Sequence, residues 1–189
     1  MLRQIVTALG MTAVFTAVLG LAYPLAVTGV AQTVFPHRAD GSLVEHDGRV
    51  VGSALISQGF TGEEYFHPRP SAVDHDARDS GGANLGPSDE GLLGDVSDRA
   101  LAYREENGLP EGAVVPVDAV TASASGLDPH ISLANAQIQA GRVARERGWD
   151  TGYVEDLVGA HTADRALGVL GEPAVNVLTL NLALDEAAP

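Results

Sequence analysis

The feature that most constrains this chain is a long uncharged segment near its N-terminus. Between Arg3 and Arg38 there is no Asp, Glu, Lys or Arg, and Ile5–Val34 consists mostly of Ala, Val, Leu, Thr, Gly and Phe. The hydrocarbon core of a bilayer is ~30 Å thick and takes roughly 20 apolar residues as a helix. The segment therefore predicts a transmembrane helix over about 5–31, within a membrane anchor formed by residues 1–36.

A cleaved signal peptide is the alternative interpretation of this segment. Arg3 would be its positively charged start, and Gly29–Ala31 supplies small residues for cleavage. The apolar run is much longer than the roughly 7–15 residues of a signal peptide, which favours a retained anchor. Positive charge tends to stay in the cytoplasm, so Arg3 and the α-amino group predict a cytoplasmic N-terminus. Residues 37–189 would then form a soluble extracytoplasmic domain of a single-pass plasma-membrane protein.

Composition excludes several functions. The chain has 189 residues, with 25 acidic and 11 basic side chains and a formal net charge of −14. Phosphate binding needs clustered cations, so nucleic acid is not an expected partner. Every basic residue is Arg, and the absence of Lys excludes Schiff-base and P-loop lysine chemistry. The absence of Cys excludes thiol catalysis, Cys-based zinc sites and disulfides.

The outer domain alternates helical and extended patterns, which indicates one mixed α/β domain after the transmembrane helix. Its longest irregular stretch, Thr61–Ser88, is rich in Gly, Pro, Ser and Asp and exceeds an ordinary connection, which favours a functional loop. Apolar spacing and capping residues predict the other elements. They are a strand over Val50–Gln58, a helix capped by Ser88 and ended by Gly108, a buried strand over Gly112–Val117, a helix from Ser132 to Arg147, a short helix over Tyr153–His161 and a final strand over Val175–Leu184.

Two loop segments carry candidate recognition groups. Pro68 and Pro70 stiffen the backbone around Arg69, whose planar guanidinium suits a carboxylate or backbone carbonyls. The favoured interpretation is that Arg69 holds a loop of its own domain in place. The second segment, Ser80–Ser88, contains three Gly and Asn84 and could form an anion-binding nest. It lacks a P-loop lysine, so a structural turn is favoured there.

A third segment, Thr121–Ser132, gathers hydroxyl, carboxylate and imidazole groups. Ser123 or Ser125 with His130 and Asp128 suggests a hydrolase triad, but the spacing does not make a nucleophile elbow. Hydroxyl side chains are equally suited to bracing a polar loop. A metal site is a further alternative, although no helical ligand pair of the H-E-x-x-H kind occurs. Its conceivable ligands are Asp74, His75, Asp76, His67 and His130.

Several separated motifs, in one order along nearly the whole chain, resemble the KdpC family, the C subunit of Kdp-type potassium-transporting ATPases. The matching segments are Gly52–Gln58, Tyr65–Phe66, Arg69–Ala72, Ser80–Ser88, Val115–Val120, Thr121–Ser132, Gln139, Arg142–Ala144, Leu170–Pro173, Val175–Leu178 and Leu180–Asp185.

The resemblance implies a non-catalytic accessory subunit of a high-affinity, ATP-driven potassium import complex. Its partners would be a potassium-binding, channel-like subunit and a P-type ATPase subunit, besides membrane lipid. The family is described as stabilising the assembly and as a catalytic chaperone that raises the nucleotide affinity of the ATPase subunit. No metal and no firmly bound cofactor are expected, and ATP would enter only through the ATPase subunit.

Eight residues are the candidates for facing a partner or bracing loops. They are Arg69, Asn84, Ser123, Ser125, Asp128, His130, Gln139 and Arg142. The alternative functions are a membrane-anchored or secreted extracytoplasmic hydrolase and a free-standing binding protein.

Overall fold

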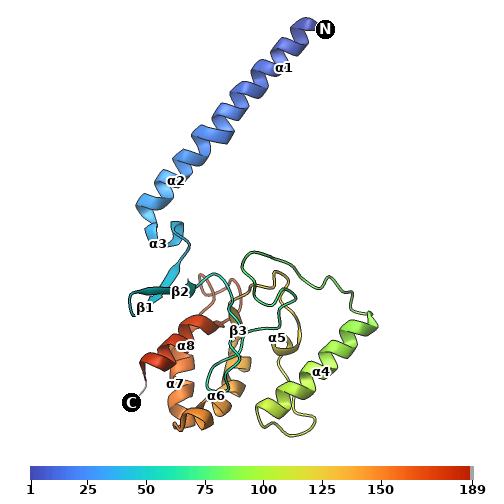
Figure 1. Ribbon diagram of the computed structural model, residues 1–189, viewed down its shortest axis with the longest axis vertical. Coiled ribbons are helices and arrows are strands. Elements are labelled where there is room, and N and C mark those ends of the chain that lie inside the picture. The colour runs from blue at the N-terminus through green and yellow to red at the C-terminus, as the bar shows by residue number, and fades with distance from the viewer. Residues whose placement is uncertain (188–189) are drawn as a thin grey trace. The chain divides into compact units, whose positions relative to one another are not determined.

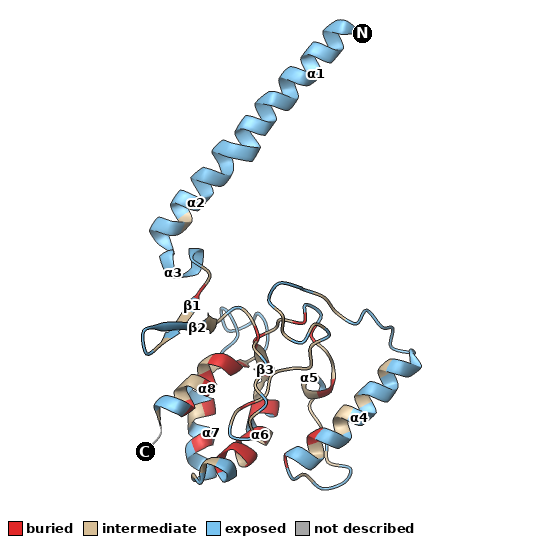
Figure 2. Cartoon of the chain, in the orientation of Figure 1, coloured by how far each residue is buried: buried red, intermediate tan, exposed pale blue. Residues whose placement is uncertain are grey.

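The computed structural model describes residues 1–187 and divides into two compact units, the first ending at Leu43 and the second beginning at Val44. The first unit is a helix that runs from Leu2 to Val34 with a mean hydropathy of 2.1 and no buried residue in its most apolar window (Figures 1 and 2). It is long and apolar enough to cross a membrane, and it includes the range predicted from the sequence. It comprises α1 (Leu2–Phe15), the π-helical segment η1 (Thr16–Ala22) and α2 (Tyr23–Val34), and is followed by the short α3 (Pro36–Ala39).

A proline explains the π-helical register within this long helix. Pro24 has no amide hydrogen, so it cannot donate to the carbonyl of Gly20 one turn earlier. Just before it, the amide of Tyr23 donates to the carbonyl of Val18, five residues back. Such local widening lets a helix continue past a proline without a break.

Short strands form two sheets, and the first of these strands begins at Leu43, the last residue of the first unit. Strands β1 (Leu43–His46) and β2 (Arg49–Ser53) form the first sheet. The other sheet has the order β3–β5–β4, from β3 (His130–Ser132), β5 (Ala174–Asn176) and β4 (Thr162–Ala163). Both pairings are antiparallel, with Ile131 opposite Val175 and Thr162 also opposite Val175.

Five helices complete the described part of the second unit. They are α4 (Glu90–Glu106), α5 (Val117–Val120), α6 (Leu133–Arg147), α7 (Thr151–Ala160) and α8 (Val177–Glu186). Side chains that accept from a backbone amide of the first turn cap four of these helices, which satisfies amides that have no partner within the helix. The caps are Asp89, Ser132, Asp150 and Asn176.

The hydrophobic core lies where α6, α7 and α8 meet the three-stranded sheet, and the buried residues gather there in Figure 2. On α6 the buried apolar positions are mostly Ala, which lets α7 pack closely against it. The segment before α4 adds one large side chain, Phe66, which is fully buried. The core members are Phe66, Ile131, Ala136, Ala140, Val143, Ala144, Val154, Val158, Val175, Val177, Leu180 and Leu184.

The mixed α/β class is confirmed, and so are three local predictions. The segment 61–88 contains no helix or strand, Ser132 caps a helix that ends at Arg147, and a short helix covers most of Tyr153–His161. Gly148 follows α6 with a φ of 68°, which favours Gly at this position. The strand predicted over Val50–Gln58 is present but ends at Ser53.

Three local predictions are wrong. The final strand covers only Ala174–Asn176, because the side chain of Asn176 caps a helix at the amide of Thr179 and the following apolar residues then have helical spacing. The cap of α4 is Asp89, one residue after Ser88. No strand forms over Gly112–Val117 in the described structure, where Val114 is 88% exposed.

Candidate functional site

The helices of the second unit hold residues 63–71 through side-chain amides; this stretch, named the extended segment below, starts with a turn at 63–65 and continues without helix or strand. Asn181 on α8 accepts from the amide of Phe66 at 2.8 Å and donates to its carbonyl at 3.0 Å. Gln139 on α6 does the same for His67, at 2.7 and 3.1 Å. These paired bonds replace a β-ladder, which the neighbouring Pro68 and Pro70 could not complete because they lack amide hydrogens.

Arg142 is the largest buried side chain in this arrangement, and its side chain is fully buried. Its guanidinium donates to the carbonyls of Glu63 and Tyr65, the latter at 3.0 Å. It also donates to the side chains of Asn107, at 3.3 Å, and Gln139, at 2.9 Å. One cation on α6 thereby fixes the start of the extended segment, the end of α4 and the amide of Gln139.

Glu106, the last residue of α4, joins this cation to a histidine. Its Oε1 lies 3.4 Å from Nε of Arg142 and 2.6 Å from Nδ1 of His67. The other ring nitrogen of His67 is 2.9 Å from the carbonyl oxygen of Gly62. Both ring nitrogens lie within hydrogen-bond distance of an oxygen, so the imidazole links the end of α4 to the chain at Gly62.

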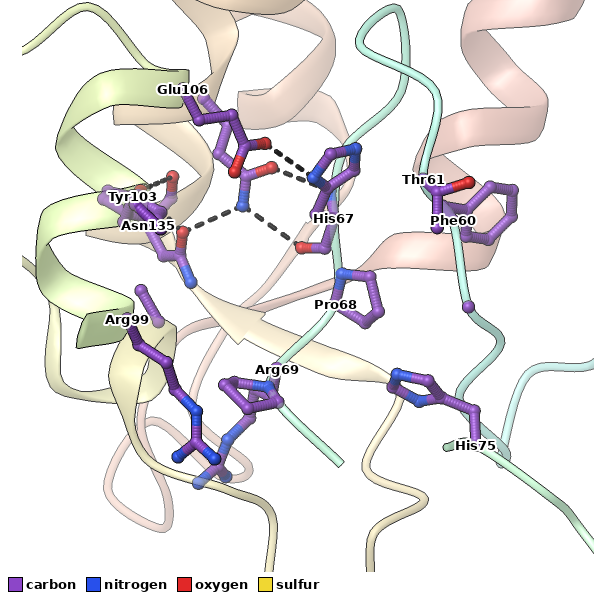
Figure 3. Close-up of a pocket in the computed structure, with 15 residues that line it drawn as sticks. Phe60, Thr61, His67, Pro68, Arg69, His75, Arg99, Tyr103, Glu106 and Asn135 are labelled. Atoms are coloured by element: carbon purple, nitrogen blue, oxygen red, sulfur yellow. Dashed lines mark hydrogen bonds and ion pairs between the residues drawn. The ribbon is translucent and has the colours of Figure 1, made fainter. Parts of the chain in front are cut away.

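These groups border a cavity of about 410 Å³ between the extended segment and α4 (Figure 3). Phe60 and Tyr103 contribute aromatic walls, and Arg69 and Arg99 also line the cavity. Arg69 Nε is, within residues 1–187, the buried side-chain donor that has no hydrogen-bond partner. The lining of the cavity is largely apolar, and the polar side chains of Asn135 and Gln139 in it are bonded to the protein itself.

A carboxylate on α5 links the cavity to the start of α6. Asp118 accepts from the amide and the hydroxyl of Ser132, both at 2.8 Å, and from the side-chain amide of Asn135 at 3.0 Å. Asn135 in turn accepts from the hydroxyl of Tyr103 at 2.8 Å and from Gln139 at 2.9 Å. Burial raises the pKa of Tyr103, so its hydroxyl remains a donor.

A second cluster brings together three of the residues singled out in the sequence. Nη1 of Arg69 donates to Oδ2 of Asp128 at 3.0 Å. The other carboxylate oxygen of Asp128 accepts from the amide of His130 at 3.0 Å and lies 3.4 Å from its Nδ1. Asp128 thus joins the extended segment to the loop that precedes β3.

The two serines of this loop brace the backbone. The hydroxyls of Ser123 and Ser125 are 3.2 Å apart, and Ser125 Oγ accepts from the amide of Leu127. The amide of Ser123 donates to the carbonyl of Pro70, and the carbonyl of Ser125 accepts from the amide of Gly81. Within the described chain neither hydroxyl hydrogen-bonds to His130, so the printed contacts form no triad.

The Gly-rich segment lies against the same loop. A Cβ on Gly82 would come within 2.7 Å of the carbonyl oxygen of Ala124, so only Gly fits this approach. Asn84 lies apart from both clusters, is exposed, has a φ of 54° and donates to the carbonyl of Gly82 at 2.9 Å. In the structure the segment is a turn packed on the 121–130 loop, and in the described residues no group of three or more His, Cys, Asp or Glu residues could hold a metal ion.

Several residues of the two clusters were missed by the sequence reasoning. They are Glu106, Asp118, Asn135, Asn107 and Asn181. Asn135 and Asn181 occupy positions of apolar helical faces, and a polar residue on such a face is the signal that could have identified them. Glu106 and Asp118 give no such signal, because their partners are distant in sequence.

Hydrogen bonds lower the pKa of the two carboxylates. The bond with His130, followed by those of its amide and of Arg69, lowers the pKa of Asp128 to about 2. The bond with His67 lowers the pKa of Glu106 below its ordinary value of 4.5. The unfolded chain therefore binds more protons than the folded chain between about pH 4.5 and 2, and acid destabilises the fold.

We expect the free energy of unfolding to fall as the pH decreases through this window. Asp128→Asn should lower stability at pH 7 and flatten this pH dependence, because one of the two carboxylates no longer titrates. Urea titrations at pH 7, 4 and 3 measure the effect, with the exposed Asp98→Asn as control. Equal acid sensitivity of Asp128→Asn and the wild type would contradict the assignment.

The fold and these clusters define a class, namely a protein with one candidate membrane-spanning helix in residues 1–187 and a small α/β domain whose loops are braced internally. The family model described as "KdpC: K+-transporting ATPase, c chain" matches residues 5–186. The protein named "Potassium-transporting ATPase KdpC subunit" from Mycobacterium tuberculosis strain H37Rv is 57% identical over 187 residues, covering 98% of this chain and 99% of the relative.

A relative with the same name from Rhodospirillum rubrum is 55% identical over 191 residues, covering 100% of this chain and 98% of its own length. That from Cereibacter sphaeroides strain ATCC 17029 is 55% identical over 168 residues, which is 89% of each chain. This chain belongs to the KdpC family.

Proposed function

We propose that the chain is a non-catalytic accessory subunit of an ATP-driven potassium import complex, and that it stabilises the assembly of a channel-like subunit with an ATP-hydrolysing subunit. The observation that carries the proposal is the full-length relationship to proteins named as subunits of a potassium-transporting ATPase. It is supported by the apolar helix Leu2–Val34, which suits a subunit held in the same membrane as its partners.

The hydrogen bonds that the candidate polar side chains make support an accessory role. Ser123, Ser125 and Asp128 bond to backbone amides or to each other, and Arg142 and Gln139 hold the extended segment. Groups engaged in this way fix loop conformation, and a fixed loop surface suits recognition of a protein partner. These contacts do not support the alternative of a hydrolase. A serine nucleophile needs a base within hydrogen-bond reach, and in the described chain neither serine hydroxyl hydrogen-bonds to His130.

The orientation follows from the charges that flank the anchor. Arg3 and the N-terminal amine precede the helix, and all 25 acidic residues follow it. We place the N-terminus in the cytoplasm and the domain outside, on the positive-inside tendency. ATP is cytoplasmic, so in this orientation the chain affects the nucleotide affinity of the ATPase subunit through assembly and not through direct contact with ATP.

The test compares cells that lack only this subunit with cells in which it is restored. We expect the deletion to abolish growth and potassium uptake at micromolar external potassium, and the full-length chain to restore both. After mild detergent extraction, the tagged chain should co-purify with the two large subunits. Recovery of the chain alone, or unchanged uptake in the deletion strain, would contradict the proposal and favour a free-standing binding protein.

A further inference from the structure

A β-hairpin arm projects from the three-stranded sheet and has no place in the clusters described above. Strands β4 and β5 pair antiparallel, and the arm is the connection between them, residues 164–173. Near its tip Ala166 and Leu170 pair, each amide donating to the other's carbonyl at 2.9 Å. An ion pair between Arg165 and Glu172 joins the two sides of its base. The arm therefore has a defined backbone.

The tip holds an apolar residue in an unfavourable backbone conformation. Leu167 has a φ of 55°, and Gly168, which follows it, has a φ of 77°. Consecutive positive φ values are typical of the centre of a type I′ turn, where Asn, Asp or Gly is preferred. A Leu there is strained, and strain of this kind is concentrated at functional sites.

The same residue is also exposed. Leu167 is 91% exposed, and two further apolar side chains of the arm, Val169 and Leu170, are 72% and 59% exposed. The charged residues Arg165 and Glu172 flank a tip that carries no charge. Backbone strain and apolar exposure both disfavour Leu at this position in the isolated chain, so its side chain suits burial in something else.

Charge and size indicate what covers the tip. The chain has a net charge of −14, and an anionic lipid surface repels such a domain. The surface area that three apolar side chains can bury is far smaller than the roughly 1,200–2,000 Å² that a stable interface between free proteins buries. The tip alone could not recruit a soluble partner or a second copy. It suffices for a partner already in the same membrane, because tethering raises the effective concentration.

We infer that the arm, residues 164–173, is a docking element whose tip, Leu167, Val169 and Leu170, inserts into an apolar pocket on the extramembrane face of another subunit of the same membrane complex. This inference rests on the proposed function, since it requires that such a complex forms. Burial of one Leu side chain corresponds to roughly tenfold or more in affinity.

The absence of Cys makes a direct test available. Leu167→Cys introduces a single thiol at the tip, and Val114→Cys introduces one at a site 88% exposed in the loop between α4 and α5. Each tagged variant is treated with a membrane-impermeant maleimide, first in the purified complex and then alone in vesicles of phosphatidylcholine with phosphatidylglycerol. The mass shift of this chain gives the fraction labelled. In intact cells, labelling of Val114→Cys also checks the orientation of the domain.

We expect Leu167→Cys to be protected at least tenfold in the complex and to react freely in vesicles, while Val114→Cys reacts in both. Free reaction of Leu167→Cys in the complex overturns the inference. Protection of Leu167→Cys in lipid vesicles that contain this chain without its partners also overturns it and assigns the tip to the bilayer. If no complex is recovered with the wild-type chain, the proposed function itself fails, which is a distinct result.

A second variant separates docking from folding. Leu167→Asn removes the apolar side chain and places a residue that tolerates positive φ. We expect an unchanged or higher thermal midpoint for the chain alone, together with at least a tenfold smaller fraction recovered in the complex. Recovery of the complex at the wild-type level would show that the tip is not a docking element.

Discussion

Replacing Arg142 with Ala is expected to lower the free energy of unfolding by about 3–5 kcal/mol, because several acceptors lose their buried donor at once. The guanidinium is fully buried, and its removal leaves the carbonyls of Glu63 and Tyr65 and the side-chain oxygen of Asn107 without this donor. Each buried acceptor without a partner costs about 1–3 kcal/mol.

Urea titration of the full-length chain in detergent, followed by the fluorescence of Trp149, measures this loss. Arg142→Met keeps most of the side-chain volume and no donor, so a comparable loss in that variant assigns the effect to hydrogen bonding. The control is Arg145→Ala, an exposed arginine on the same helix, which should change stability by less than about 0.5 kcal/mol. A loss below about 1 kcal/mol for Arg142→Ala would refute its role.

Phe66→Ala is expected to cost about 3–5 kcal/mol, the range for removing a fully buried Phe. The backbone amide and carbonyl of Phe66 are held by Asn181, so the segment cannot easily collapse into the cavity that the ring leaves. The same urea titration reports the change. Phe60→Ala, which truncates a half-buried ring nearby, should cost only about 1–2 kcal/mol. Equal losses would mean that Phe66 does not anchor the segment.

The anchor and the capped helices were readable from the sequence because their signals are local. A helix over Leu2–Val34 follows from apolar composition, and α6 follows from Ser132 at its start and Gly148 at its end. The C-terminal helix α8 was misread as a strand, since apolar residues alternate with Asn and Thr over part of 175–184 and so short a segment does not distinguish a strand from a helix. The cap at Asn176 resolves the ambiguity only when its geometry is known.

The structure divides the candidate residues between separate clusters, and no pattern in the sequence predicts this division. Asp128 and His130 were considered together in the sequence and do meet, and the structure adds Arg69, which is 59 positions from Asp128. Gln139 and Arg142 belong to a different cluster, with Glu106 and His67. Asn84 lies outside both.

By itself, the sequence determined the apolar N-terminal helix, the long irregular loop, the acidic α/β domain and, through its ordered motifs, the resemblance to the KdpC family. Only the tertiary structure decided that side-chain amides hold the extended segment, that the buried Arg142 pairs with Glu106, and that Leu167 is exposed at a strained turn. The physical reason is the separation in sequence over which each kind of interaction acts. Helix period and capping act over a few residues, whereas Asn181 meets Phe66 across 115 positions and Arg142 meets Glu63 across 79.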